Sequence, residues 1–328
     1  MTPLHVIGAA ELREKVHFVD LIEAMAEAFR LSSEGRAQNG QIVFFPGQAA
    51  DTGDIYIKTG AVAGRPLCVV KIAPWFATNL QRGHSQGGFW AVLDAETGHT
   101  RAILEDEHYL SDIRTAAAGA LVARLFAPEN IDTVALLGAG TQAWWQVQAL
   151  YAERRFSRLS IWARDAAKAA DLAGRLSPHL PGVTIIIAAS AEAAVRVCDV
   201  LITATQSREP IVRLAWLRPG AHVTAVGADD ATKCELEPNL LRHGRTFVDD
   251  KAIALNNGDV GRAVNAGAAP EDIITGEIGD VLLGRLPARL NADDITVAKL
   301  VGLGVQDLLT AEYVLRTVTT AARDQSKT

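Results

Sequence analysis

The stretch that decides the fold is VALLGAGTQA, residues 134–143. Its first four residues are typical of a buried strand, and they lead directly into the pattern GxGxxA at the start of a helical segment. Gly138 would permit a tight turn, Gly140 would let the backbone approach a pyrophosphate, and Ala143 would keep the helix close to the strand. The free N–H groups at the start of the helix would bind the phosphates. The residues expected to contact a dinucleotide here are Gly138, Ala139, Gly140, Thr141 and Gln142.

A glycine-rich turn without a ligand is the alternative for this stretch, and its surroundings argue against that alternative. Strand patterns alternate with helical patterns through this part of the chain. The predicted strands are residues 133–137, 159–163, 183–188, 200–205, 222–226 and 246–248. Such alternation buries a parallel sheet between two layers of helices, so we predict an α/β fold with a Rossmann-type doubly wound parallel sheet.

The N-terminal third has a different pattern. Short β-like runs separated by Gly, Pro, Asn and Asp occupy residues 40–94 and predict an antiparallel or mixed sheet. Before them, a capping box at Asp20 and Glu23 predicts a helix that stops at Gly35. After them, residues 115–126 have the composition of a further helix.

The C-terminal segment, residues 295–323, has the pattern of one long helix with no strand, and we expect it to return to the N-terminal region. These two parts would then form one discontinuous α+β domain. We therefore predict a first domain of residues 1–118 with 298–328, and a dinucleotide-binding domain of residues 119–297.

Composition excludes several classes of protein. Of the 328 residues, 49% are hydrophobic and 21% are charged, which is ordinary for a globular protein and unlike a disordered one. The net charge of −6 argues against a nucleic acid or an anionic membrane as partner, because both require a basic surface. The three cysteines show no disulfide or metal-ligand spacing. No leader or membrane-spanning pattern occurs, so we expect a cytoplasmic protein without a metal site.

The choice between the two nicotinamide dinucleotides depends on the end of the second strand. An acidic residue there would accept a hydrogen bond from the ribose 2′-OH of NAD, but the first polar residue is Arg164, followed by Lys168. Two cations suit a 2′-phosphate, so we favour NADP over NAD, although Asp165 could still reach the ribose and Arg164 could be an ordinary surface charge. Small residues at later strand ends are expected to lie near the ribose and nicotinamide: Thr203, Thr205, Val226 and Gly227.

Several further stretches, taken together and in order, resemble the ornithine cyclodeaminase/mu-crystallin family over nearly the whole chain. They are residues 70–72 (VKI), 94–98 (DAETG), 112–119 (DIRTAAAG), 137–143 (LGAGTQA), 202–205 (ITAT), 226–236 (VGADDATKCEL) and 295–307 (ITVAKLVGLGVQD). The resemblance implies a homodimer in which the discontinuous domain binds substrate and forms the dimer. It also implies either cyclisation of a diamino acid with loss of ammonia or reduction of imines and oxo acids.

The resemblance also implies roles for single residues. Lys71 and Arg114 resemble the cations that hold the substrate carboxylate, Asp229 resembles the acid–base carboxylate beside the reacting carbon, and Lys233 resembles the lysine that follows it. The chemistry agrees, because a guanidinium and an ammonium suit a carboxylate and a nearby acid can stabilise an iminium. The structural alternatives are a helix-end charge for Arg114, a strand-edge charge for Lys71 and a turn residue for Asp229.

This sequence departs from the family pattern at the substrate. An early arginine of cyclodeaminases is replaced near Gln41, and Lys58 stands where many of them carry methionine, so Lys58 is expected to supply the missing cation. Residues 299–301 (KLV) replace a small hydroxyl-bearing triplet that follows an acidic residue in ornithine-specific members, which would hinder binding of a second substrate amine. His84 lies in a loop that also differs, and we interpret it as a polar loop residue rather than a substrate contact.

These features favour an NAD(P)H-dependent imine or imino-acid reductase, equivalent to an amino-acid dehydrogenase running in reverse, acting on a small carboxylate substrate. Asp229 and Lys71 are the expected catalytic residues, and Lys58, Lys71 and Arg114 the expected substrate-binding ones. The alternatives are an ornithine-type cyclodeaminase with recycled cofactor, a dehydratase of a hydroxylated proline-like acid, and a non-catalytic ligand-binding protein on the same fold.

Overall fold

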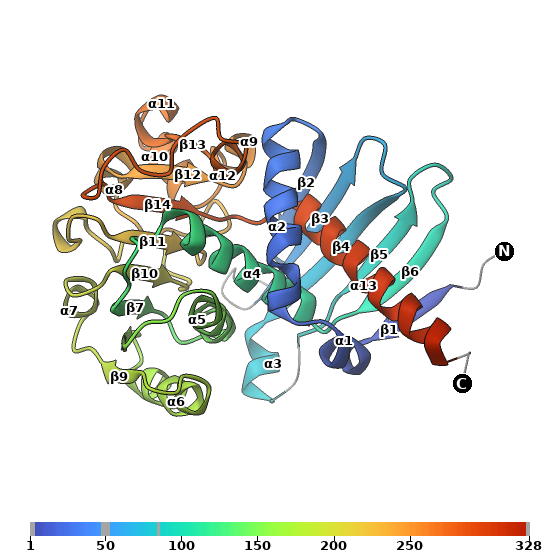
Figure 1. The fold of residues 1–328 in the computed structure, drawn as a ribbon, viewed down its shortest axis with the longest axis horizontal. Helices are drawn as coiled ribbons and strands as arrows, with labels where there is room; N and C mark the ends of the chain where they lie inside the picture. The colour runs from blue at the N-terminus through green and yellow to red at the C-terminus, as the bar shows by residue number, and fades with distance from the viewer. Residues whose placement is uncertain (1–3, 47–52, 84–85, 326–328) are drawn as a thin grey trace. The chain divides into compact units, whose positions relative to one another are not determined.

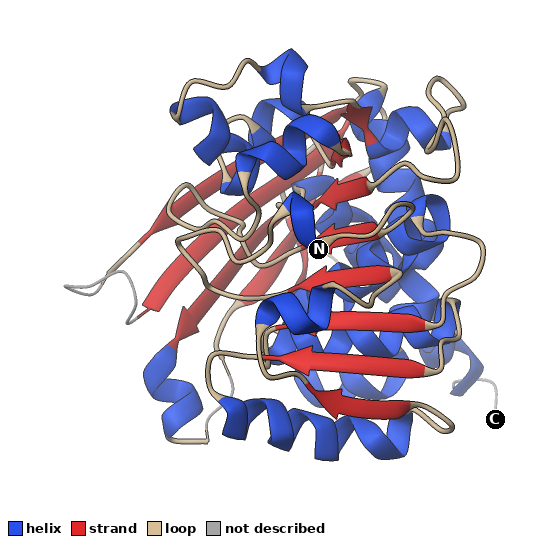
Figure 2. Cartoon of the chain, turned by 90° about the vertical axis from the view of Figure 1, so that its left-hand side faces the viewer, coloured by secondary structure: helices blue, strands red, loops and turns tan. Residues whose placement is uncertain are grey.

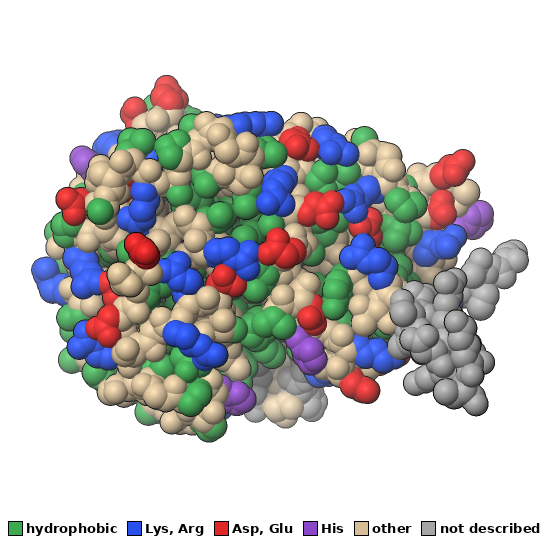
Figure 3. All heavy atoms as spheres, viewed as in Figure 1, with side chains coloured by type: hydrophobic (Ala, Val, Ile, Leu, Met, Phe, Trp, Pro, Cys, Tyr) green, Lys and Arg blue, Asp and Glu red, His purple; other side chains and the backbone are tan. Residues whose placement is uncertain are grey.

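A computed structural model describes residues 4–46, 53–83 and 86–325 of the chain. The chain forms two compact units, which we treat separately: unit 1 is Met1–Arg114 with Leu303–Thr328, and unit 2 is Thr115–Gly302. No helix among the described residues is both long and apolar enough to span a membrane. Figure 3 shows cationic and acidic side chains interspersed over the face that it presents.

Unit 1 is built on a mixed sheet, one of the two arrangements that the sequence predicts. Its strands are β1 (His5–Gly8), β2 (Ala37–Phe44), β3 (Gly53–Val62), β4 (Leu67–Phe76), β5 (Phe89–Asp94) and β6 (Thr100–Glu105). The strand order is β1-β6-β5-β4-β3-β2, and only the β1–β6 pair among these is parallel (Figure 1). Strands β1 and β6 were not among the predicted ones.

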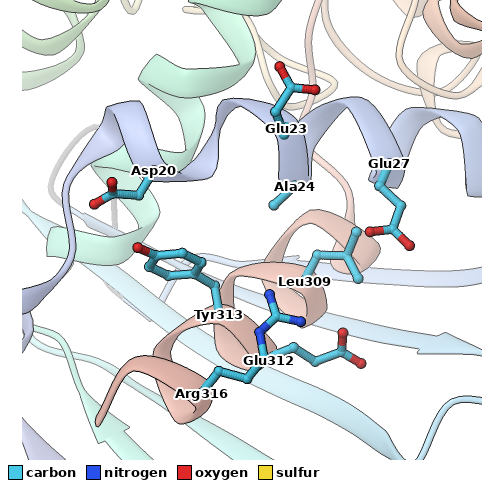
Figure 4. Close-up of a pocket in the computed structure, with 8 residues that line it drawn as sticks. All are labelled: Asp20, Glu23, Ala24, Glu27, Leu309, Glu312, Tyr313 and Arg316. Carbon is cyan, nitrogen blue, oxygen red and sulfur yellow. The ribbon is translucent and has the colours of Figure 1, made fainter. Parts of the chain in front are cut away.

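Two long helices of unit 1 lie together, with α13 also against the sheet. The helices are α1 (Ala9–Lys15), α2 (Phe18–Ser33), α3 (Ala77–Gln81), the start of α4 (Tyr109–Phe126) and α13 (Gly304–Gln325). Helix α13 contacts β3 and β4 as well as α2. Figure 4 shows the groove between α2 and α13, with acidic side chains of both helices around it. One face of α13 is therefore held by the sheet and another by α2.

The start of α2 differs in detail from the prediction. The capping box is present, but its N-cap is His17, and Asp20 is the third residue of the helix, where its carboxylate accepts from the His17 N–H at 3.0 Å. The predicted box lies three residues too late, because Asp20 fits either position of the motif. The predicted apolar face is buried, including Met25 and Phe29.

Unit 2 confirms the doubly wound parallel sheet. Its strands are β7 (Thr133–Leu137), β8 (Arg158–Trp162), β9 (Thr184–Ile187), β10 (Val200–Thr203), β11 (His222–Ala225), β12 (Arg245–Val248), β13 (Gly276–Glu277) and β14 (Thr296–Lys299). The order is β13-β12-β14-β11-β10-β7-β8-β9, and every pair is parallel. The chain reverses its direction of strand addition between β7 and β10, which is where such sheets bind ligands.

Helices cover both faces of this sheet (Figure 2). They are the later part of α4, then α5 (Thr141–Glu153), α6 (Ala166–Leu176), α7 (Ala191–Val195), α8 (Pro238–His243), α9 (Lys251–Ala254), α10 (Gly258–Asn265), α11 (Pro270–Ile273) and α12 (Ile278–Leu282). Alternate residues of β7 face opposite cores: Val134 packs with residues of α5 and α6, and Ala135 with residues of α7, α8 and α10. The period of two in a strand produces this separation.

The prediction of one continuous helix over residues 295–323 is wrong. Residues Thr296–Lys299 form β14, a fully buried strand between β11 and β12, and α13 begins only at Gly304. A short apolar run cannot be assigned to helix or strand by periodicity alone, and the two neighbouring strands supply the hydrogen bonds that decide it. The predicted boundary between residues 297 and 298 falls inside this strand.

Candidate functional site

The turn after β7 has the geometry that a pyrophosphate site requires. Gly138 has φ +122°, and a Cβ placed on it would lie 2.3 Å from the Ala204 carbonyl oxygen, so only glycine fits. Helix α5 follows with Gly140 as its N-cap, and this glycine provides no side-chain cap hydrogen bond. Ala143 is fully buried, while Gly140 and Thr141 are exposed. The uncapped N–H groups and the exposed turn fit a phosphate ligand.

The end of β8 carries the residues expected near the adenosine ribose. Arg164, Asp165 and Lys168 are all exposed. The Asp165 carboxylate accepts hydrogen bonds from the Ala167 and Lys168 N–H groups, at 3.0 and 3.4 Å, and so caps α6. Its role as helix cap gives Asp165 a structural function, whereas Arg164 and Lys168 form no ion pair within the part of the chain that the structure describes.

The strand ends predicted to meet the nicotinamide are joined by a residue that sequence reasoning missed, Glu235. Its Oε1 accepts from the N–H and hydroxyl of Thr205, at 2.7 and 2.8 Å. Its Oε2 accepts from the Thr203 hydroxyl at 2.8 Å and from the Gly227 N–H at 2.9 Å. Val226, beside Gly227, is buried. The ends of β10 and β11 are thus fixed by one carboxylate.

A second buried acid and a lysine lie behind Glu235. Asp259 Oδ1 accepts from the N–H groups of Glu235 and Leu236, at 2.6 and 2.7 Å. Asp259 Oδ2 lies 3.2 Å from Lys299 Nζ, and both side chains are fully buried. Burial and the charge of Asp259 raise the pKa of Glu235, and Lys299 opposes them. The sequence suggested that Lys299 adds a cation that hinders a second substrate amine. Its ion pair with Asp259 inside unit 2 weakens that suggestion.

The two adjacent aspartates in the loop after β11 make different contacts. Asp230 Oδ1 accepts from the Thr232 N–H, the Thr232 hydroxyl and the Lys233 N–H, so it shapes the loop. Asp229 Oδ1 lies 2.7 Å from Lys233 Nζ, and the Asp229 side chain is one-third exposed. Asp230 is the turn former, and Asp229 keeps an accessible carboxylate held by a cation. This arrangement suits proton transfer by Asp229.

Unit 1 buries a cluster of cations around one carboxylate. Lys71 on β4 places its Nζ 2.9 and 2.8 Å from the two oxygens of Asp307, in the first turn of α13. Arg114 on α4 donates from Nε to Asp307 Oδ1 at 3.1 Å. Lys58 is the cross-strand neighbour of Lys71, and Gln41 is the neighbour of Lys58 on β2. All of the predicted carboxylate-binding cations are therefore brought together and buried.

The charged groups of this cluster shift one another's pKa values. Burial lowers the pKa of Lys71 to about 8, while Asp307 acts in the opposite direction. Burial opposes the ionisation of Asp307, but Lys71, Arg114 and Lys58 hold the pKa of its carboxyl below the ordinary value. Asp106 is the other acid acting on Lys71, and burial raises its pKa.

Asp307 was not singled out from the sequence, although one signal was present. It is an acidic residue in the apolar segment VGLGVQDLL, where a charge needs a partner because burial without one is costly. Its partner Lys71 lies 236 positions away in the chain. His84 lies outside the described residues. Among the described residues, no group of three or more His, Cys, Asp or Glu side chains could hold a metal ion.

Comparison with known proteins identifies a matching family model and similar relatives. Residues 5–321 match the model of the ornithine cyclodeaminase/mu-crystallin family. A Δ1-pyrroline-2-carboxylate reductase of Paracoccus denitrificans is 32% identical over 233 residues, which cover 70% of this chain and 72% of that protein.

Two solved structures are similar over almost the whole chain. The Δ1-pyrroline-2-carboxylate reductase of Thermococcus litoralis, in complex with NADH and L-proline, has a TM-score of 0.89 and 25% identity, and the match covers 97% of this chain and 98% of that one. An archaeal alanine dehydrogenase dimer with bound NAD has a TM-score of 0.87 and 26% identity, with 97% of both chains covered.

Proposed function

Because the chain belongs to the ornithine cyclodeaminase/mu-crystallin family, we propose that it is an NAD(P)H-dependent reductase of a small imino acid, with one carboxylate and one reacting nitrogen. The observation that carries the proposal is the burial of three cations, Lys58, Lys71 and Arg114, around the carboxylate of Asp307. Buried cations are costly unless anions pair with them. A substrate carboxylate is the anion that this family's chemistry provides.

The same cluster disfavours a diamino acid. The second amine of such a substrate is positively charged at neutral pH, and a cationic site repels it. Lys58, which departs from the family pattern, adds to this repulsion. A cyclic imino acid brings no second amine, and a similar protein, the Thermococcus litoralis reductase, was solved with L-proline. These observations support reduction over cyclodeamination.

The residues of this chain have separate tasks in the proposed reaction. Lys71 and Arg114 bind and orient the substrate carboxylate, and Asp307 holds both cations in place. A nicotinamide cofactor, when bound, supplies the hydride to the imine carbon. Asp229 keeps a proton on the imine nitrogen and stabilises the resulting positive charge, while Lys233 holds the Asp229 carboxylate in position.

For the cofactor, the turn at Gly138 and the uncapped start of α5 fit a dinucleotide. We favour NADPH over NADH, because Arg164 and Lys168 are both exposed beside β8 and Asp165 is engaged as a helix cap. A 2′-phosphate would meet two cations there.

For the partner, we propose a second copy of this chain. The edge strand β2 exposes Ile42 (60%) and Phe44 (42%), and β5 exposes Phe89 (37%), all on the sheet of unit 1. Exposed apolar side chains on a sheet are candidates for a protein interface. The similar alanine dehydrogenase is a dimer.

The test is a direct assay with purified protein. Cyclic imino acids such as Δ1-pyrroline-2-carboxylate, and oxo acids with ammonia or amines, are offered with NADPH or NADH while the absorbance of the reduced cofactor is followed. Loss of reduced cofactor with a cyclic imino acid is the expected result. Ornithine, lysine and diaminobutyrate are offered in parallel with catalytic cofactor. Release of ammonia without net cofactor turnover would contradict the reductase and identify a cyclodeaminase.

A further inference from the structure

One fully buried carboxylate, that of Glu235, ties together the ends of two strands in unit 2. Both of its oxygens are used, and each accepts one backbone N–H and one threonine hydroxyl. The backbone N–H groups of Thr205 and Gly227 can only donate, so Glu235 must accept at both oxygens. A carboxyl group has two oxygens that can accept these N–H groups.

Glu235 is itself held by a second set of charges. Asp259, at the start of α10, accepts from the Glu235 N–H and thereby fixes the backbone that carries the carboxylate. Lys299, at the end of β14, pairs with Asp259 and lies 3.4 Å from the Ala225 carbonyl oxygen at the end of β11. These contacts run from the ends of β10 and β11 through Glu235, Asp259 and Lys299, and they return to the end of β11.

The Lys299–Asp259 ion pair is not by itself evidence of a role in stability. Replacing buried ion pairs with apolar residues is often neutral or stabilising, so buried charges are weak devices for stability. The surroundings are nevertheless shaped around Glu235. A Cβ on Gly227 would lie 2.5 Å from Glu235 Oε1 and 2.3 Å from the Thr205 carbonyl oxygen, so glycine is required for the contact.

We propose that Glu235 is a positioning residue for the nicotinamide half of the dinucleotide, acting through the strand ends at Thr203, Thr205 and Gly227. The inference rests on the proposed function, because it assumes that a dinucleotide lies along these strand ends. Glu235 touches the strand ends rather than the reacting atoms. Its removal should therefore affect binding of the nicotinamide half and leave binding of the adenosine half largely unchanged.

The test is the variant Glu235→Gln, measured by calorimetric titration. Glutamine keeps the size of the side chain, but its NH2 group must face a backbone N–H, that of Thr205 or of Gly227, which can only donate. NADPH should bind about tenfold or more weakly, because a buried donor left without an acceptor is costly. The fragment 2′-phospho-ADP-ribose, which lacks the nicotinamide, should bind within about twofold of wild type. NADH and ADP-ribose form the corresponding pair without the phosphate.

A matched control is Glu237→Gln, two positions along the same segment, where the carboxylate accepts from the Leu214 N–H instead. This control should leave the ratio of NADPH to fragment affinity at the wild-type value. If Glu235→Gln does not fold, Thr203→Val removes one donor from Oε2 and keeps Glu235. Its ratio should shift in the same direction by about threefold.

The outcomes separate this inference from the proposed function. Equal weakening of NADPH and its fragment in Glu235→Gln would mean a general structural role, and unchanged affinity for both would mean no role. Either result would overturn the inference, while binding of the dinucleotide by the wild-type protein would still support the proposed cofactor. Wild-type protein that binds neither dinucleotide nor fragment would refute the proposed function and this inference together.

Discussion

Lys71→Met tests the carboxylate clamp most directly. Methionine has a similar length and suits a buried position, but it removes the ammonium group that lies 2.9 and 2.8 Å from the oxygens of Asp307. A hydrogen bond to a charged group contributes about 1.5–3 kcal/mol, and each 1.4 kcal/mol is about tenfold in affinity. The KM for the imino acid should therefore rise about 10- to 150-fold. NADPH affinity should stay unchanged, because the residues proposed to bind the cofactor lie in unit 2.

Two further variants make this prediction specific. Lys15→Met removes a lysine that also pairs with a carboxylate, Glu11 at 2.7 Å, but on the surface of unit 1, and it should leave KM unchanged. The double variant Lys71→Met/Asp307→Asn removes both charges of the buried pair, so it should recover thermal stability lost in the single variant while KM stays high. A KM for Lys71→Met within about twofold of wild type, or a parallel loss of NADPH affinity, would refute the clamp.

Four other predictions concern pH, proton transfer, cofactor choice and assembly. Because the pKa of Lys71 is about 8, its ammonium is lost as pH rises through that value, so kcat/KM should fall on the alkaline side, and Lys71→Arg should move the fall to higher pH. The pKa of Lys71 in the folded state is below its unfolded value of 10.5. The contribution of Lys71 to stability should therefore rise between about pH 8 and 10.5, and thermal melts across that range check the sign. Asp229→Asn should lower kcat by about 10²–10⁴-fold with NADPH affinity intact, and turnover near the wild-type rate would show that Asp229 does not transfer the proton. Arg164→Ala with Lys168→Ala should weaken NADPH about tenfold or more relative to NADH, and equal weakening of both in titrations would refute recognition of a 2′-phosphate. Ile42→Asp with Phe44→Asp should turn a dimer into a monomer by light scattering, and an unchanged mass would place the interface elsewhere.

How far the fold could be predicted depended on whether the signal was local. The segment around Gly138 carries its own strand, turn and helix pattern, and β7 begins and ends at the predicted residues. Strand β14 had no such signal. Its four residues, TVAK, continue an apolar run toward α13, and only pairing with β11 and β12 makes them a strand. Secondary structure that depends on distant neighbours cannot be derived from periodicity.

The candidate site shows the same limit in its side chains. Lys71, Arg114 and Asp229 could be proposed from the resemblance, because each lies in a stretch with a matching pattern. Asp307 and Glu235 could not be proposed by reasoning from single residues, because each is defined by its partners. The partners of Asp307 lie 236 and 193 positions away, and those of Glu235 include Thr203, 32 positions away. Sequence indicates which residues carry charge, and the fold determines which charges meet.

Both units use a buried carboxylate to hold groups proposed to bind ligand, and the groups that they hold differ in a way that fits the two ligands. In unit 2, Glu235 holds backbone N–H and hydroxyl groups at the strand ends, and Asp259 and Lys299 lie behind it. In unit 1, Asp307 holds the cations Lys71 and Arg114. A site that gathers cations is suited to a substrate carboxylate. The Asp307→Asn change removes a negative charge, so it should strengthen anion binding and lower KM. It should also loosen the orientation of Lys71 and Arg114 and lower kcat, so both constants should fall together.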